Sequence, residues 1–128
     1  MATILLVEDD DAIRRLLRKA LVAAGFEVEE AANGVVALAA YRRRASDLVI
    51  TDLVMPEKDG LEMIMDLRRL DPAVKIIAMS GGSRTFGQAQ LYLDSARLFG
   101  AVRILAKPFS ASALLKAVAE VLPPPSSA

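Results

Sequence analysis

The segment TILLVEDDD, residues 3–11, joins an apolar run directly to a run of acidic side chains. The apolar part, Thr3–Val7, has the length and composition of a buried strand. Apolar residues then recur at helical spacing over residues 11–24, and Gly25 follows as a helix terminator. The segment therefore predicts a buried strand, an acidic loop and an amphipathic helix. The apolar stripe expected on that helix consists of Ile13, Leu16, Leu17, Ala20, Leu21 and Ala24.

Outward from this segment, the alternation of a short β-like run and a helical run occurs about five times. Strands that alternate with helices predict a parallel sheet with helices on both faces, which is the flavodoxin-like, doubly wound α/β class. The half-exposed alternation in residues 26–31 favours an edge strand. The expected strands are 3–7, 26–31, 48–51, 75–79 and 102–105, and the expected helices are 11–24, 34–44, 60–70, 86–98 and 110–122.

Composition limits both the size of the fold and its chemistry. The 128 residues, 54% of them apolar, suit one domain, which we place at residues 1–122. Residues 123–128 are rich in Pro and Ser and are expected to form a disordered tail. The chain contains no Cys and no His, which excludes disulfides, thiolate metal sites and Ser-His-Asp catalysis. Covalent chemistry must therefore use carboxylates, hydroxyls or lysine.

The charges and the amino terminus argue against a membrane or nucleic-acid role. Sixteen basic residues balance sixteen acidic ones, so neither nucleic acid nor an anionic membrane is expected as a partner. The first apolar run is short and ends in acidic residues, unlike a secretory signal, and no stretch approaches the length of a membrane helix. We expect a cytoplasmic protein.

Polar side chains follow four of the predicted strands. Glu8 and Asp9 follow the first strand, Asp52 the third, Ser80 the fourth and Lys107 the fifth. Because the carboxyl ends of parallel strands meet at one edge of a sheet, these groups are expected to converge there. Three close carboxylates repel one another, and a hard divalent ion such as Mg²⁺ offsets that repulsion. A metal and a lysine beside a carboxylate nucleophile suit phosphoryl transfer.

The same residues resemble a known family. ILLVEDD, VITDLVMPEKDG, IIAMSGG and LAKPF stand in the order and spacing of response-regulator receiver domains of two-component signalling, over about residues 3–122. The resemblance implies the strand order 2-1-3-4-5 and a phosphoacceptor at Asp52. It also implies Mg²⁺ held by Asp9 directly, by Glu8 through a bound water, by Asp52, and by the backbone carbonyl of Val54.

The resemblance also implies roles for two side chains beside the phosphoryl group, and the sequence differs from the family pattern in two places. Ser80 matches the switch hydroxyl, and Lys107 matches the lysine that pairs with the phosphoryl group. Ile104 stands where the family often has a Tyr or Phe that rotates inward on activation, so the signal must be transmitted differently here. The segment between Ser80 and Lys107 is also several residues longer than is usual, and an altered fourth helix is expected.

The expected function is therefore a phosphorylation-dependent switch without turnover of outside substrates. A histidine kinase or a histidine phosphotransfer protein would supply the phosphoryl group, and a downstream protein target would read the result. The chain is expected to act alone, or alternatively to be the receiver module of a larger regulator or hybrid kinase. An Mg²⁺-dependent aspartyl-phosphate phosphatase is a further alternative. Such enzymes need a second Asp two residues after the nucleophile, where this chain has Val54.

Several of these residues have an alternative, purely structural interpretation. Asp10 or Asp11 is expected to cap the first helix, since acids favour helix amino termini. Ser80 could alternatively be an ordinary hydroxyl residue of a loop, and Lys107 could be a solvated lysine before a turn.

Overall fold

The computed structural model describes residues 2–53, 60–81, 103–107 and 109–122. The strands and helices of this part of the chain are β1 (Thr3–Val7), α1 (Asp11–Ala23), β2 (Glu27–Ala31), α2 (Gly34–Arg43), β3 (Leu48–Asp52), α3 (Gly60–Leu70), β4 (Ile76–Gly81), β5 (Arg103–Lys107) and α5 (Ala111–Val121). Strands and helices alternate as far as β4, and β5 is the next described element. The helix predicted over residues 86–98 and the tail predicted over residues 123–128 lie outside the described residues.

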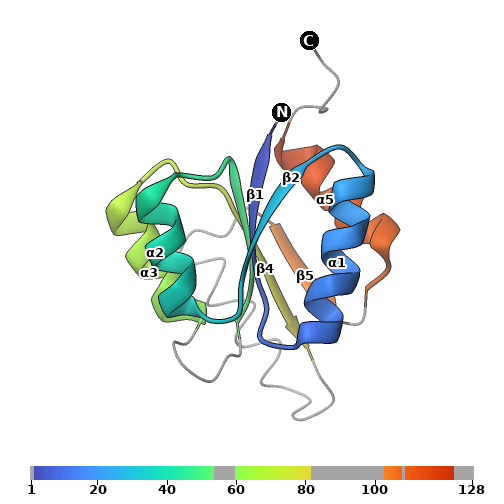
Figure 1. Cartoon of the computed structure of the whole chain (residues 1–128), viewed down its shortest axis with the longest axis horizontal. Helices are drawn as coiled ribbons and strands as arrows, with labels where there is room; N and C mark the ends of the chain where they lie inside the picture. Colours follow the sequence, from blue (N-terminus) through green and yellow to red (C-terminus); the bar gives the residue numbers. More distant parts are fainter. Residues whose placement is uncertain (1, 54–59, 82–102, 108, 123–128) are drawn as a thin grey trace.

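The strands form one parallel sheet in the order β2-β1-β3-β4-β5, which confirms the predicted fold class and strand order. Figure 1 shows α2 and α3 on one face of the sheet and α1 and α5 on the other. The first strand lies inside the sheet, between β2 and β3. All strand carboxyl ends therefore lie along one edge, which is the lower edge in Figure 1.

Two apolar clusters pack on opposite faces of the sheet, and the pleat of each strand divides its residues between them. In β1, Leu5 and Val7 belong to the cluster under α2 and α3, whereas Ile4 and Leu6 belong to the cluster under α1 and α5. All four side chains are buried. A strand buried on both faces is apolar throughout, which explains why the sequence shows a continuous apolar run and no alternation.

Short polar side chains define where three of the helices begin. Oδ1 of Asp10 accepts the N–H of Ile13 at 3.0 Å, and Oδ1 of Asn33 accepts that of Val36 at 2.9 Å. Oγ of Ser110 accepts the N–H of Ala113 at 3.0 Å. Each cap contributes about 1 kcal/mol to helix stability. The expectation that Asp10 or Asp11 caps the first helix is confirmed, and Asp10 is the cap.

The predicted apolar stripe of α1 is wrong in one position. Leu17 and Leu21 are buried against the sheet, but Leu16 is 67% exposed. Successive residues of a helix are turned by about 100°, so Leu16 lies well away from the line that joins Leu17 to Leu21, one turn apart. Leu16 therefore does not belong to the core.

The edge strand β2 carries charge where its side chains face solvent, as the sequence predicted. Glu29 pairs with Arg43 of α2 at 3.2 Å, and Glu30 pairs with Arg18 of α1 at 3.2 Å. Exposed pairs of this kind contribute little to stability. Their charge discourages another chain from adding to the open edge of the sheet.

The hydroxyl of Tyr41 forms a hydrogen bond that ties α2 to the segment after α3. It donates to Oδ2 of Asp71 at 2.7 Å, and the Tyr41 side chain is buried. Burial raises the pKa of Tyr41 well above its ordinary value of 10.0, and the hydrogen bond to Asp71 and the charge of Asp47 raise it further. The folded state therefore favours the protonated phenol. That contribution to stability is fully present below pH 10 and is lost as the pH rises through the folded pKa.

We expect one of the two tyrosines of the chain to keep its proton in alkali until the protein unfolds. The measurement is near-ultraviolet tyrosinate absorbance against pH, followed together with far-ultraviolet circular dichroism. In Tyr41→Phe, the absorbance step that coincides with unfolding should disappear. Ionisation of both tyrosines near pH 10, with the fold intact, would contradict the assignment.

Candidate functional site

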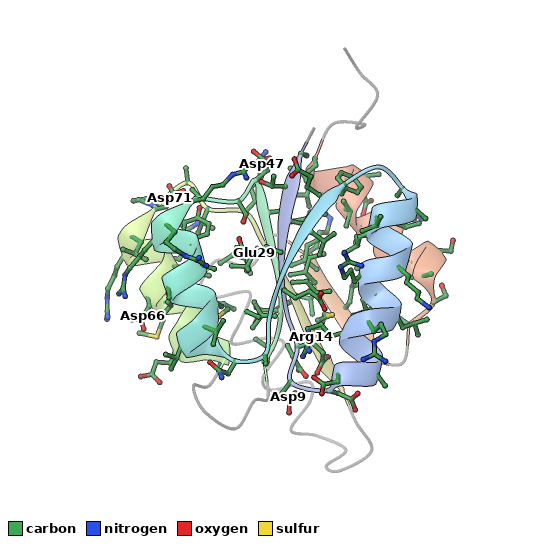
Figure 2. The ribbon with its side chains drawn as sticks, in the orientation of Figure 1. Asp9, Arg14, Glu29, Asp47, Asp66 and Asp71 are labelled. Carbon is green, nitrogen blue, oxygen red and sulfur yellow. The ribbon has the colours of Figure 1, made fainter. Side chains whose placement is uncertain are left out.

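Three carboxylates meet at the carboxyl edge of the sheet. Glu8 and Asp9 follow β1, and Asp52 ends the neighbouring strand β3. One carboxylate oxygen from each of the three residues lies within 4.8 Å of the other two. Figure 2 shows Asp9 at this edge, at the opposite end of the sheet from Asp47. The predicted convergence is confirmed for these three residues.

Two of the three carboxylates are removed from solvent. Glu8 is 1% exposed and Asp52 is 6% exposed, whereas Asp9 faces solvent. Burying like charges side by side is unfavourable unless a positive charge compensates them. The donors are all hard carboxylate oxygens, the type that Mg²⁺, Ca²⁺ and Mn²⁺ prefer. The residues present therefore fit a hard divalent cation.

The position of Asp52 follows from its place at the end of a central strand. Every residue of β3 is buried, and Asp52 pairs with Met79 of β4 in the parallel register. The backbone N–H of Leu53 donates to the carbonyl of Met79 at 2.9 Å, and Oγ1 of Thr51 donates to the carbonyl of Asp52 at 2.9 Å. The backbone on both sides of Asp52 is thus held by neighbouring groups.

Backbone hydrogen bonds also hold the loop that carries Glu8. The N–H of Glu8 donates to the carbonyl of Ala31, the last residue of β2, at 3.1 Å. The N–H of Asp10 donates to Oε2 of Glu8 at 3.2 Å. The acidic run is therefore divided in function, since Glu8 and Asp9 face the site and Asp10 caps α1.

Ser80 and Lys107 are placed by their backbones at the same edge. Ser80 pairs with Ala106, and Gly81 pairs with Lys107. Ser80 and Lys107 therefore lie at the carboxyl ends of two paired strands. Val54 and its predicted carbonyl ligand lie outside the described residues. The roles assigned to Ser80, Lys107 and Val54 stay predictions.

The strands at the site are longer than the sequence predicted. β3, β4 and β5 end at Asp52, Gly81 and Lys107, whereas the sequence placed their ends at residues 51, 79 and 105. The reason is that the neighbouring backbone continues to pair beyond the last apolar side chain. Asp52, Ser80 and Lys107 are therefore carried by the sheet itself, whereas Glu8 and Asp9 lie in the loop after β1.

Sequence reasoning missed one residue of this region, Arg14. Its side chain is 17% exposed, and Nη1 donates to the carbonyl of Glu8 at 2.8 Å. The available signal was its place in α1, because Arg14 interrupts the apolar helix one turn after the acidic run. A charged residue between Ile13 and Leu17 needs polar partners when the helix packs on the sheet.

Two further observations concern the rest of the described chain. A hollow of about 500 Å³ lies at the amino ends of the strands, lined in part by Tyr41, Asp47 and Asp71, and it takes no part in the acidic site at the opposite edge.

Within residues 2–53, 60–81, 103–107 and 109–122, no helix has the length and apolar character needed to cross a membrane.

Comparison with known proteins points to one family. The sequence profile described as "Response regulator receiver domain" matches residues 4–119. The response regulator receiver protein CpdR of Brucella abortus is 37% identical, over 95% of this chain and 98% of its own length. The crystal structure of the chemotaxis protein CheY4 of Vibrio cholerae superposes with a TM-score of 0.83 at 32% identity, covering 95% of this chain and 99% of that one.

The same sequence also matches part of a much longer protein. The sensor kinase CckA of Brucella abortus is 41% identical over 94% of this chain, but the match spans only 12% of the kinase. Similar sequences therefore occur both as nearly whole proteins and as one part of a larger protein.

Proposed function

This chain belongs to the response regulator receiver domain family, and from that premise we propose that Asp52 is its phosphoryl acceptor. The observation that carries the proposal is the group formed by Glu8, Asp9 and Asp52 at the carboxyl edge of the sheet. Asp52 ends β3 and is almost completely buried, whereas the other two acids come from the adjacent strand end. In that arrangement Asp52 would both accept the phosphoryl group and share the cation with Glu8 and Asp9.

The proposed cation is Mg²⁺, which Glu8, Asp9 and Asp52 would hold together with the backbone carbonyl of Val54. When bound, Mg²⁺ neutralises negative charge that develops on the phosphoryl oxygens. Lys107 would add a second positive charge from the end of β5, and Ser80 would donate its hydroxyl to a phosphoryl oxygen from the end of β4.

In the proposed reaction, a carboxylate oxygen of Asp52 attacks the phosphorus of the donor. The new O–P bond forms as the bond between phosphorus and the donor's imidazole nitrogen breaks, and Asp52 becomes an acyl phosphate. Water later attacks the phosphorus, releases inorganic phosphate and regenerates the carboxylate. We propose that the chain catalyses only these two steps on itself and turns over no outside substrate.

The donor histidine must come from another protein or another domain, because this chain contains no His. A histidine kinase or a histidine phosphotransfer protein supplies that chemistry, and a downstream protein would bind the switched surface. The proposed location is the cytoplasm, where such kinases present their phosphohistidine. The relatives support a stand-alone regulator and a receiver within a longer chain alike.

The proposal predicts that phosphorylation depends on a divalent cation held by Asp9. With acetyl phosphate as donor, intact mass should show one added phosphoryl group in Mg²⁺ and none in EDTA. Asp9→Asn should raise the Mg²⁺ concentration needed for half-maximal phosphorylation by on the order of 10–100-fold, because a carboxylate ligand is lost.

The matched control is Asp10→Asn. It removes the same charge from the adjacent residue, lies outside the carboxylate group, and keeps an equally good helix cap. We expect its Mg²⁺ requirement to stay within a few-fold of the wild type. Equal requirements in Asp9→Asn and the wild type, or full phosphorylation in EDTA, would refute the metal assignment.

A further inference from the structure

The guanidinium of Arg14 joins three separate parts of the fold. Nη1 donates to the carbonyl of Glu8 at 2.8 Å, Nη2 to Oδ1 of Asp11 at 2.7 Å, and Nε to Oε1 of Glu30 at 3.2 Å. These acceptors belong to the loop after β1, to the first turn of α1 and to the edge strand β2. Figure 2 shows Arg14 near the lower end of α1, toward the edge of the sheet where Asp9 lies.

Arg14 differs from an ordinary surface arginine. Its side chain is 17% exposed, compared with 46% for Arg18 one turn further along the same helix. Burial lowers the pKa of Arg14, but its hydrogen bonds to Asp11 and Glu30 and their charges outweigh that effect and raise it overall. The guanidinium therefore stays charged, and its two carboxylate partners hold its planar fork in one orientation.

The carbonyl that Arg14 contacts is one end of the peptide group that joins Glu8 to Asp9. Because a peptide group is planar, holding its oxygen also sets the direction in which the chain enters Asp9. The other polar groups of Glu8 already have partners, since its N–H is bonded to Ala31 and its carboxylate accepts the N–H of Asp10. Asp9 itself faces solvent and is not held by packing.

We propose that Arg14 is a positioning residue that holds the Glu8–Asp9 peptide group so that the three carboxylates are arranged to bind a divalent cation. This inference rests on the proposed function, in which Glu8, Asp9 and Asp52 hold Mg²⁺. It adds a partner that contacts neither the metal nor the phosphoryl group but orients the residues that do. Replacing partners of this kind commonly changes metal affinity by about 10–100-fold.

Positioning and simple electrostatics predict opposite effects when Arg14 is replaced. A positive charge near an acidic group repels an incoming cation, so loss of that charge alone should tighten Mg²⁺ binding. Loss of the bond to the Glu8 carbonyl should instead loosen the arrangement of the carboxylates and weaken Mg²⁺ binding. The sign of the change in affinity therefore separates the two explanations.

The test compares Arg14→Gln with Arg18→Gln. Arg18 lies on the same helix and forms an ion pair with the same Glu30 at 3.2 Å, whereas the Glu8 carbonyl is contacted by Arg14. Each variant loses one positive charge and one contact to Glu30. The dissociation constant for Mg²⁺ is measured by titration calorimetry on the unphosphorylated protein, with circular dichroism at the same temperature to verify folding. The amide chemical shift of Asp9 provides a second readout.

We expect Arg14→Gln to weaken Mg²⁺ binding about 10-fold and to move the Asp9 amide resonance. Arg18→Gln should bind Mg²⁺ as well as the wild type or slightly more tightly. Arg14→Lys keeps the charge without the planar fork, so it should lie between the wild type and Arg14→Gln. If Arg14→Gln does not fold, the test rests on Arg14→Lys. Weaker Mg²⁺ binding in Arg14→Lys would support the positioning role, because that variant keeps the positive charge.

The possible failures are distinguishable. Equal affinities in Arg14→Gln and Arg18→Gln, or tighter binding in Arg14→Gln, would overturn the positioning role and leave the metal site intact. A wild-type protein that binds no Mg²⁺ would overturn the proposed function itself, and the inference with it.

Discussion

We expect Asp52→Asn to take up no phosphoryl group from acetyl phosphate, whereas the wild type should take up one. The reason is chemical, because an amide oxygen is too weak a nucleophile to form the acyl phosphate. The substitution keeps nearly the same shape at a residue that is 6% exposed, so the backbone pairing of β3 with β4 should be retained. Intact mass after incubation with Mg²⁺ and acetyl phosphate measures the effect directly.

The control for this prediction is Asp47→Asn. Asp47 precedes β3 at the opposite end of the same strand, where Oδ2 accepts the N–H of Thr3 at 2.8 Å. Its replacement removes the same charge without touching the carboxyl edge, and phosphorylation should proceed normally. A stoichiometric adduct on Asp52→Asn, located by peptide mapping at another residue, would show that the acceptor has been assigned wrongly.

Ile50→Ala should cost about 2–5 kcal/mol of the free energy of unfolding. Ile50 is completely buried at the middle of β3, where it pairs with Leu6 on one side and Ile77 on the other. Removal of its side chain leaves a cavity in the cluster under α1 and α5. Domains of this size have a total stability of about 5–15 kcal/mol, so the loss is a large share of it. Urea unfolding followed by circular dichroism gives the value.

Leu16→Ala serves as the comparison for Ile50→Ala. The apolar pattern of the sequence placed Leu16 in the core, but the side chain is 67% exposed. We expect the free energy of unfolding to change by less than about 0.5 kcal/mol, since alanine is also a good helix former. A loss as large as that of Ile50→Ala would mean that Leu16 packs against another part of the protein.

The sequence predicted the fold class and the acidic group because both depend on short-range patterns and on parallel topology. Apolar runs located β1, β3, β4 and β5, and an alternating pattern located β2. The position of Glu8, Asp9 and Asp52 after or at strand ends brought them to one edge. Strand limits were less predictable. Backbone pairing carries β4 and β5 past their apolar residues to Gly81 and Lys107, and no side-chain pattern encodes that pairing.

Arg14 could not be assigned from the sequence because one of its three partners, Glu30, lies in a different element of the fold. Its contact to Glu30 depends on how α1 packs beside β2, which is a three-dimensional relation. Ile104 illustrates a different limit. It is half-buried against the cluster under α2 and α3, and that packing is a three-dimensional relation that the apolar pattern of the sequence does not specify.

The position of β1 also affects how the chain folds as it is made. Within this domain, the first strand to be synthesised becomes an inner strand, and its partner β3 begins at Leu48, about 40 residues later. At typical rates of synthesis, that interval lasts on the order of 2–8 seconds. During this time the side of β1 that will pair with β3 has no partner strand, so the apolar residues Ile4–Val7 stay partly exposed. Nascent chains that stall in this interval should therefore be strong clients for chaperones that bind exposed aliphatic segments.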